Sequence, residues 1–162
     1  MTNEDMIYQL LDELGIAYDC LEHEPIFSVI EAAEKGIVLP GQQVKNLFLK
    51  NKKGRQFYLV ILRDEKTADI RRLAEVLGEK RLSFANSSDL ERLLQVQPGA
   101  VTPFGLLFDR EHRVQLIVDE DVDASQTVGF HPFVNHRTLN IAYTDFLRFL
   151  EKAEHPARRI RC

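Results

Sequence analysis

Residues 47–62, LFLKNKKGRQFYLVIL, decide the fold class of this chain. Two apolar runs flank a polar turn at residues 51–54, and this is the pattern of a β-hairpin. The second run, at residues 57–62, is apolar throughout, and such a strand is covered on both of its faces. The sequence therefore predicts a hairpin whose second strand is central in its sheet.

Helix and strand signals surround the hairpin without a regular alternation. Helical spacing of apolar residues or a capping residue predicts helices at residues 4–14, 28–35, 67–77, 87–94 and 145–152. Strands are predicted at residues 17–21, 81–85, 129–131 and 138–142, and a second hairpin at residues 102–118. Because the helices do not alternate with the strands one for one, we expect an α+β fold. It is a single domain over residues 1–162, with a mostly antiparallel mixed sheet and helices packed around it.

Composition indicates an ordinary globular protein. The chain has 162 residues, of which 44% are hydrophobic and 28% charged, and this size suits one domain with a real core. An apolar run of about 18 residues is absent from the sequence, so we expect no membrane span and no membrane partner. Cys20 and Cys162 form no CxxC pair, and together with the acidic N-terminus this predicts a cytoplasmic protein. Residues 155–162 are expected to be a mobile basic tail.

The net charge of −4 argues against a general nucleic-acid coat and against DNA as a partner, because phosphate binding rests mainly on positive charge. Local basic clusters remain candidates for RNA contact, and each is equally readable as a solvated face. The candidate RNA-binding residues are Lys50, Lys52, Lys53, Lys80 and Arg81.

Common catalytic and cofactor signatures are missing from the sequence. It has no phosphate-binding P-loop, no GxGxxG after a strand, no GxSxG and no HExxH. His131 and His136 are five residues apart on a strand and its following loop, which is a poor spacing for a metal site. We therefore expect no metal and no cofactor.

Three local features are unusual for purely structural segments. Lys45-Asn46 stands at the mouth of the first hairpin, where the lysine is either functional or a strand-end side chain that reaches solvent. The stretch at residues 98–105 holds two glycines and two prolines, so it either presents N–H groups to a substrate or turns the chain into a strand. His131 lies between Phe130 and Pro132, and it is either structural or part of a site.

These features occur together and in order in a known family. The chain resembles the YbaK/ProX prolyl-tRNA editing family, and within it the freestanding Ala-tRNA(Pro) deacylases of the ProXp-ala type. The resemblance extends from the first predicted helix to the last. It rests on four matching stretches, at residues 44–50, 81–84, 99–106 and 130–132 together with Asn135.

The resemblance implies a function and a set of site residues. Members of the family hydrolyse the ester that joins a wrong amino acid to the 3′ end of a tRNA, without a metal, and the terminal ribose hydroxyl takes part in activating water. By resemblance, Lys45 and Asn46 are the catalytic residues. The residues expected to bind the substrate are Gly99, Val101, Thr102, Pro103, Phe104, Gly105, His131 and Asn135.

The expected substrate is the acceptor end of tRNA(Pro) mischarged with alanine, and prolyl-tRNA synthetase is a further candidate partner. Residues 101–105, VTPFG, differ from the Gly-Gly-x-Ser-Pro type of stretch in the cysteine-specific branch and so favour alanine. Two alternatives stay open at this point. The protein could be a non-catalytic module that senses aminoacyl-tRNA or an amino acid, or a deacylase of a sister specificity for serine, threonine or cysteine.

Overall fold

The computed structural model describes residues 1–25, 34, 36 and 40–162. Its described helices are α1 (Asn3–Glu13), α3 (Ile70–Val76), α4 (Ser87–Leu94), α5 (Tyr143–Lys152) and the 3-10 helix η1 (Pro103–Phe108). Its described strands are β1 (Asp19–Glu22), β2 (Val44–Asn51), β3 (Phe57–Arg63), β4 (Leu82–Phe84), β5 (Val114–Asp119), β6 (Thr127–Phe130), β7 (Arg137–Ala142) and β8 (Arg158–Ile160). The helix predicted at residues 28–35 lies outside the described residues.

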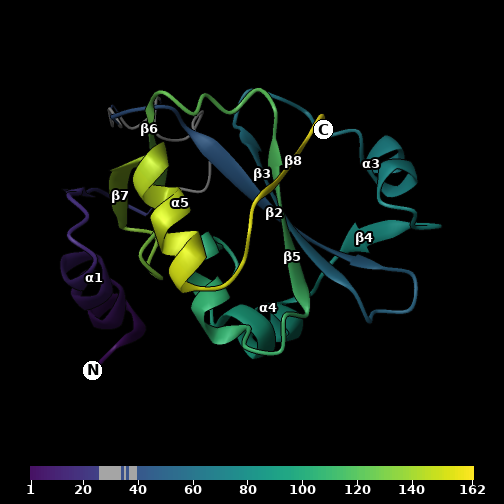
Figure 1. Cartoon of the computed structure of the whole chain (residues 1–162), viewed down its shortest axis with the longest axis horizontal. Coiled ribbons are helices and arrows are strands. Elements are labelled where there is room, and N and C mark those ends of the chain that lie inside the picture. The colour runs from purple at the N-terminus through teal and green to yellow at the C-terminus, as the bar shows by residue number, and fades with distance from the viewer. Residues whose placement is uncertain (26–33, 35, 37–39) are drawn as a thin grey trace.

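The strands form two sheets, as the cartoon in Figure 1 shows. A three-stranded antiparallel sheet has the order β1-β7-β6, and a five-stranded mixed sheet has the order β4-β2-β3-β5-β8. In the larger sheet β2 pairs antiparallel with β3 and β4, while β3–β5 and β5–β8 are parallel. The predicted α+β fold with a mostly antiparallel mixed sheet is confirmed.

The first hairpin and its central strand are also confirmed. β2 pairs with β3 from Val44↔Arg63 to Lys50↔Phe57, and β3 is the middle strand of the five. Residues 57–62 are all buried, as expected for a strand that is covered on both faces. Alternate residues of β3 therefore enter two cores.

Each core lies on one face of the larger sheet. Phe57, Leu59 and Ile61 point into the larger core, which also holds apolar residues of α1, α4, η1, α5 and the smaller sheet. Tyr58, Val60 and Leu62 point into the smaller core, which is closed by residues of α3 and by Cys162. The central strand thus fixes which functional residue can reach which side of the molecule.

The predicted hairpin at residues 102–118 is wrong. Residues 103–108 form η1, since the Thr102 side chain accepts a hydrogen bond of 3.3 Å from the Phe104 N–H. Pro103 occupies the first helical position, where its missing N–H costs little. β5 then pairs in parallel with β3, for example at Phe57↔Val114, instead of folding back on the preceding segment.

The expectation of a mobile tail at residues 155–162 is contradicted as well. Residues 158–160 form β8, which extends the sheet beside β5. The Arg159 guanidinium donates to the Glu120 and Val122 carbonyl oxygens at 2.9 and 2.6 Å. The Cys162 N–H donates to the buried Asp119 carboxylate at 2.7 Å. The edge of β5 and this carboxylate hold the tail in place.

Candidate active site

Lys45 and Asn46 lie at the start of β2, outside the part of the strand that β4 covers. β3 covers one side of this segment, with Lys45 opposite Leu62 and Asn46 opposite Ile61. β4 pairs only with residues 49–51 of β2, so among the named strands of the described chain the other side of Lys45-Asn46 is unpaired. Unpaired N–H and C=O groups at such an edge are available to a ligand.

The two residues point to opposite faces of the sheet. Side chains alternate along a strand, and Asn46 shares its face with Phe48 of the larger core, whereas Lys45 shares its face with Leu47 and Leu49 beside the smaller core. The structure therefore brings Lys45 and Asn46 together at one edge, and it separates their side chains across that edge. A substrate that lies along the edge could contact both.

Asn46 carries an unusual buried polar atom. Its Oδ1 is buried and has no hydrogen-bond partner among the described residues. A buried acceptor without a donor costs about 1–3 kcal/mol, so an observed exception points to a role. This oxygen is suited to accept a hydrogen bond from a hydroxyl group or a water molecule.

Gln42 fixes the path of the chain into this segment. Its side-chain amide donates to the Asp123 carbonyl oxygen at 2.6 Å, and its Oε1 accepts from the Asp123 N–H at 2.9 Å. Its backbone N–H donates to the Thr127 carbonyl oxygen, and Gln42 forms a parallel bridge with Val128 of β6. The start of β2 is thereby held beside β6, which leads to His131.

Gly41 makes this close approach possible. It has a φ of +71°, and a Cβ there would lie 2.3 Å from the Thr127 Oγ1 and 2.6 Å from the Asn140 Oδ1. Sequence reasoning named neither Gly41 nor Gln42 as a site residue. The signal for them is the polar GQQ stretch at residues 41–43, directly before an apolar strand.

The stretch at residues 99–105 is mostly inside the protein. Thr102, Pro103, Phe104 and Gly105 are buried, whereas Gly99 and Val101 are half-buried. A Cβ on Gly105 would lie 2.5 Å from the Leu94 carbonyl oxygen. Gly105 thus allows η1 to pack against α4, and the residues of this stretch with exposed surface are Gly99 and Val101.

The loop that follows β6 packs against η1. Phe104 makes an edge contact with Phe130, at 5.8 Å between ring centroids, and Phe108 makes one with Phe133 at 5.9 Å. Phe133 has a φ of +69°. The structure therefore brings the predicted substrate-binding stretches at residues 99–105 and 130–135 together, and half-buried Asn135 lies in the same loop.

His131 has a defined tautomer in its neutral form. Its Nδ1 lies 2.9 Å from the Arg137 carbonyl oxygen. A carbonyl only accepts, so Nδ1 carries the proton, and Nε2 is an acceptor without a hydrogen-bond partner among the described residues. Burial lowers the pKa of His131, and nearby His23 adds to this effect, although the hydrogen bond with Arg137 opposes it. The neutral ring is the form that the site favours.

His23 is a neighbour that sequence reasoning did not select. Its ring centroid lies 6.4 Å from that of His131. Its Nδ1 donates to the Glu24 carbonyl oxygen at 2.7 Å, and its Nε2 lies 2.8 Å from the Thr138 Oγ1. Thr138 is buried next to Arg137, so the two rings are held by consecutive residues of β7.

The candidate RNA-binding residues lie at the opposite end of β2 from Lys45. Lys52 and Lys53 are exposed in the β2–β3 turn, and Lys80 and Arg81 are exposed directly before β4. Lys50 is half-buried and forms an ion pair with Asp89 of α4 at 3.4 Å. The turn and β4 lie at one end of the molecule in Figure 1, so these residues surround a single region.

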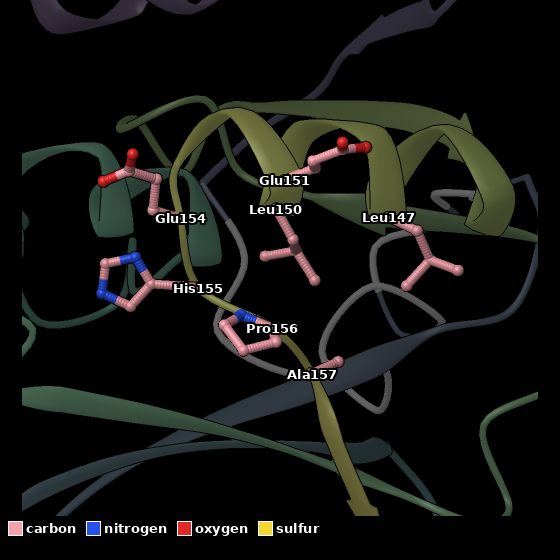
Figure 2. A pocket seen from close by; sticks show the side chains of 7 residues that line it. All are labelled: Leu147, Leu150, Glu151, Glu154, His155, Pro156 and Ala157. Atoms are coloured by element: carbon pink, nitrogen blue, oxygen red, sulfur yellow. The ribbon is translucent and has the colours of Figure 1, made fainter.

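A separate hollow of about 450 Å³ lies between α5 and the chain that follows it. Figure 2 shows Leu147 and Leu150 pointing from α5 toward Pro156 and Ala157. The residues that line this hollow include none of the candidate site residues. It is therefore distinct from the site at β2.

Among the described residues, none of the helices is both long and apolar enough to cross a membrane.

Comparison with known proteins identifies the class that this fold and site define. A family model described as the aminoacyl-tRNA editing domain matches residues 23–149, and the chain belongs to this family. The matched residues contain β2, η1 and the loop after β6. The membership of the YbaK/ProX family expected from the sequence is confirmed.

Two curated relatives and one solved structure define the neighbourhood more closely. The prolyl-tRNA editing protein ProX of Acetoanaerobium sticklandii is 34% identical over 151 residues, covering 93% of this chain and 92% of that protein. Prolyl-tRNA synthetase associated domain-containing protein 1 of Danio rerio is 35% identical over 149 residues, covering 91% of this chain and 80% of that protein. The crystal structure of a candidate trans-editing enzyme for prolyl tRNA synthetase has the same fold, with a TM-score of 0.69 at 17% identity over 100% of this chain and 98% of that one.

Proposed function

We propose that the protein is a trans-editing hydrolase that deacylates mischarged Ala-tRNA(Pro) and releases alanine and free tRNA(Pro). Family membership and the similarity to ProX support the deacylation of a mischarged tRNA. The observation that carries the proposal is the Oδ1 of Asn46, which is buried without a hydrogen-bond partner among the described residues, next to Lys45 where β4 does not cover β2. This edge offers a cation and a hydrogen-bond acceptor to an aminoacyl ester.

The side chains suit ester hydrolysis in distinct ways. Water attack on the ester carbonyl develops negative charge on the carbonyl oxygen, which the Lys45 ammonium can stabilise. The Asn46 Oδ1 accepts a hydrogen bond from the terminal ribose or from the attacking water. The Nε2 of His131 accepts from the substrate. These side chains orient the ester and polarise its carbonyl group, and the tRNA ribose hydroxyl assists the attack by water.

The proposed reaction uses no metal. Among the described residues no three His, Cys, Asp or Glu side chains gather in an arrangement that could hold one. The acceptor end of the tRNA approaches over the exposed basic residues near the β2–β3 turn and β4. Prolyl-tRNA synthetase is a candidate partner, because relatives carry its name.

A deacylation assay tests the proposed function. We expect purified protein to release labelled alanine from Ala-tRNA(Pro) with multiple turnovers, and to release little from tRNA(Pro) charged with serine, threonine, cysteine or proline. Tight binding of Ala-tRNA(Pro) without release would identify a sensing module instead. Faster release of serine, threonine or cysteine would assign a sister specificity.

We also propose that the enzyme spares Pro-tRNA(Pro) by excluding proline. Alanine offers one methyl group, which supplies only about 1–3 kcal/mol of preference, whereas the larger proline ring can be rejected by a clash. The stretch beginning at Gly99 is suited to form the wall, since η1 fixes it against α4. Pro103 is buried at the first position of η1 and stiffens the turn.

Pro103→Gly is expected to open this wall. Loss of the fixed φ should raise kcat/KM for Pro-tRNA(Pro) relative to that for Ala-tRNA(Pro) by about tenfold or more, which corresponds to about 1.4 kcal/mol. Steady-state kinetics with both substrates measures the ratio. Pro98→Gly is a matched control, because Pro98 is exposed and lies outside η1. A Pro103→Gly variant that still spares proline at full alanine activity would place the wall elsewhere.

A further inference from the structure

Phe84 is an exposed aromatic residue at the end of β4. Its side chain is 63% exposed, and among the large hydrophobic residues exposed in the described chain it is the sole aromatic one. Leu82, two residues earlier on the same strand, is buried in the smaller core. The strand thus begins in the core and presents a ring to solvent where it ends.

The register places Phe84 on the same sheet face as Lys45. Phe84 pairs with Leu49 of β2, and directly opposite residues of a pair share a face. Lys45 lies four residues earlier on β2, on that same face by alternation. At the rise of a strand, four residues span about 13 Å. Phe84 therefore lies a short distance along the sheet from the catalytic candidate.

Positive charge gathers near the start of the strand that carries this ring. Residues 50–55 and 70–84 contain eight lysines and arginines against two glutamates, a net charge of +6, although the whole chain has a net charge of −4. These residues belong to the β2–β3 turn, α3 and the approach to β4, which lie together at one end of the molecule in Figure 1. The net positive charge of these segments suits a polyanion.

We propose that Phe84 is a stacking platform for an unpaired nucleobase of the tRNA 3′ end. The inference rests on the proposed function, because it places the ester at Lys45 and runs the single-stranded end past the side of β2 that β4 does not cover, toward Phe84. Aromatic side chains stack unpaired bases while nearby cations hold the phosphates. Lys80 and Arg81 precede β4, and Lys52 and Lys53 lie in the turn, so both features are present.

Charge favours a nucleic acid over a protein as the occupant. β4 has three residues, which is short for a strand that recruits another strand at a sheet edge. A protein interface around an exposed ring is depleted of lysine, whereas exposed lysines lie before β4 and in the neighbouring β2–β3 turn. A nucleobase can stack on the ring, and the phosphates of the same strand can form ion pairs with the lysines.

Binding of uncharged tRNA(Pro) tests the platform without requiring catalysis. We expect Phe84→Ala to raise the Kd of intact tRNA roughly 5- to 100-fold, the usual range for one stacked base. Phe84→Leu should fail to restore binding, and Phe84→Trp should restore it. Trimming the unpaired 3′ nucleotides from the tRNA should weaken binding to the wild type by a similar factor, with no further loss in Phe84→Ala, because both changes remove one interaction.

Leu147→Ala is the matched control, since Leu147 is 43% exposed on α5, away from β4. Equal losses with intact and trimmed tRNA, or restoration by Phe84→Leu, would overturn the platform. A Phe84→Ala variant that changes only the oligomeric state in sedimentation would assign the ring to a protein contact instead.

The deacylation assay separates this inference from the proposed function. If the protein releases alanine with a KM that does not depend on Phe84, the stacking role of Phe84 is wrong and the proposed deacylase function stands. If the protein releases no alanine, but its binding of tRNA is weakened both by 3′ trimming and by loss of Phe84, the proposed deacylase function is wrong and the stacking role of Phe84 stands.

Discussion

Replacing Lys45 with alanine is expected to lower kcat/KM for Ala-tRNA(Pro) by about 10²–10³, or roughly 2.7–4 kcal/mol of transition-state stabilisation. The reason is the loss of a fixed positive charge beside the ester carbonyl. Lys45 is half-buried at the start of β2, and its side chain makes no hydrogen bond or ion pair with another described residue. Replacement by alanine leaves no described group without a hydrogen bond or ion pair, so the fold should be retained.

Steady-state kinetics and circular dichroism measure this result together. A fall in kcat with little change in KM would show that Lys45 acts in the transition state, whereas a rise in KM alone would show ground-state binding of the tRNA end. Lys152→Ala is the matched control, because Lys152 is exposed at the end of α5. Unchanged turnover in Lys45→Ala, or a variant that does not fold, would remove Lys45 from the catalytic role.

The first hairpin could be predicted from sequence because its signals are local. The polar turn at residues 51–54 and the apolar run at residues 57–62 lie next to each other in the chain. The pairing of β3 with β5 could not be predicted in this way. Parallel neighbours are joined by long connections, and Phe57 pairs with Val114 across four intervening helices and strands. The hairpin predicted at residues 102–118 was the local alternative.

The tail was misjudged for a related reason. Four of the residues at 155–162 are arginine or histidine, which suggested a solvated segment. Ile160 and Cys162 alternate with arginines in the pattern of a half-buried strand, but the pattern is short. The edge of β5 and the Asp119 carboxylate that receives the Cys162 N–H are distant in sequence.

For the candidate site, sequence located the stretches but not their geometry. The prediction grouped Lys45 and Asn46, and strand alternation alone could have separated their faces. It assigned Gly105 to the substrate wall, whereas its contact is with Leu94 of α4. His23 was missed, because its relation to His131 depends on β1 pairing with β7.

A buried ion pair joins the tail to the end of η1. The His155 Nε2 lies 2.9 Å from the Asp109 Oδ2, and its Nδ1 lies 2.7 Å from the Ala153 carbonyl oxygen. Both neighbours are acceptors, and this arrangement favours the doubly protonated imidazolium form of His155. The Asp109 carboxylate also accepts the N–H groups of Arg113 and Val114 at 2.9 and 2.8 Å.

In this ion pair the pKa of each group is shifted in the direction that favours its charged form. Burial opposes ionisation of each group, but hydrogen bonding outweighs it, so the pKa of His155 is raised and that of Asp109 is lowered. Stability from His155 is complete below its unfolded pKa of about 6.5 and is lost as pH rises through its folded pKa. Stability from Asp109 is complete above about pH 4 and is lost as pH falls through its folded pKa.

Asp109→Asn is therefore expected to lower the free energy of unfolding by about 3–5 kcal/mol near pH 5–6, because it leaves a buried imidazolium without its carboxylate. The loss should shrink toward pH 9, as His155 deprotonates in the wild type. Denaturant titrations of both proteins across this range measure the difference.

Asp145→Asn is the control, since Asp145 forms an exposed ion pair with Arg148 and its replacement should cost about 1 kcal/mol or less. His112 lies 4.9 Å from His155 between ring centroids, and its Nε2 lies 3.9 Å from the Glu154 carboxylate, so the titrations are repeated in His112→Ala. A loss that is small, or that grows with pH in both backgrounds, would show that His155 is neutral in the folded protein.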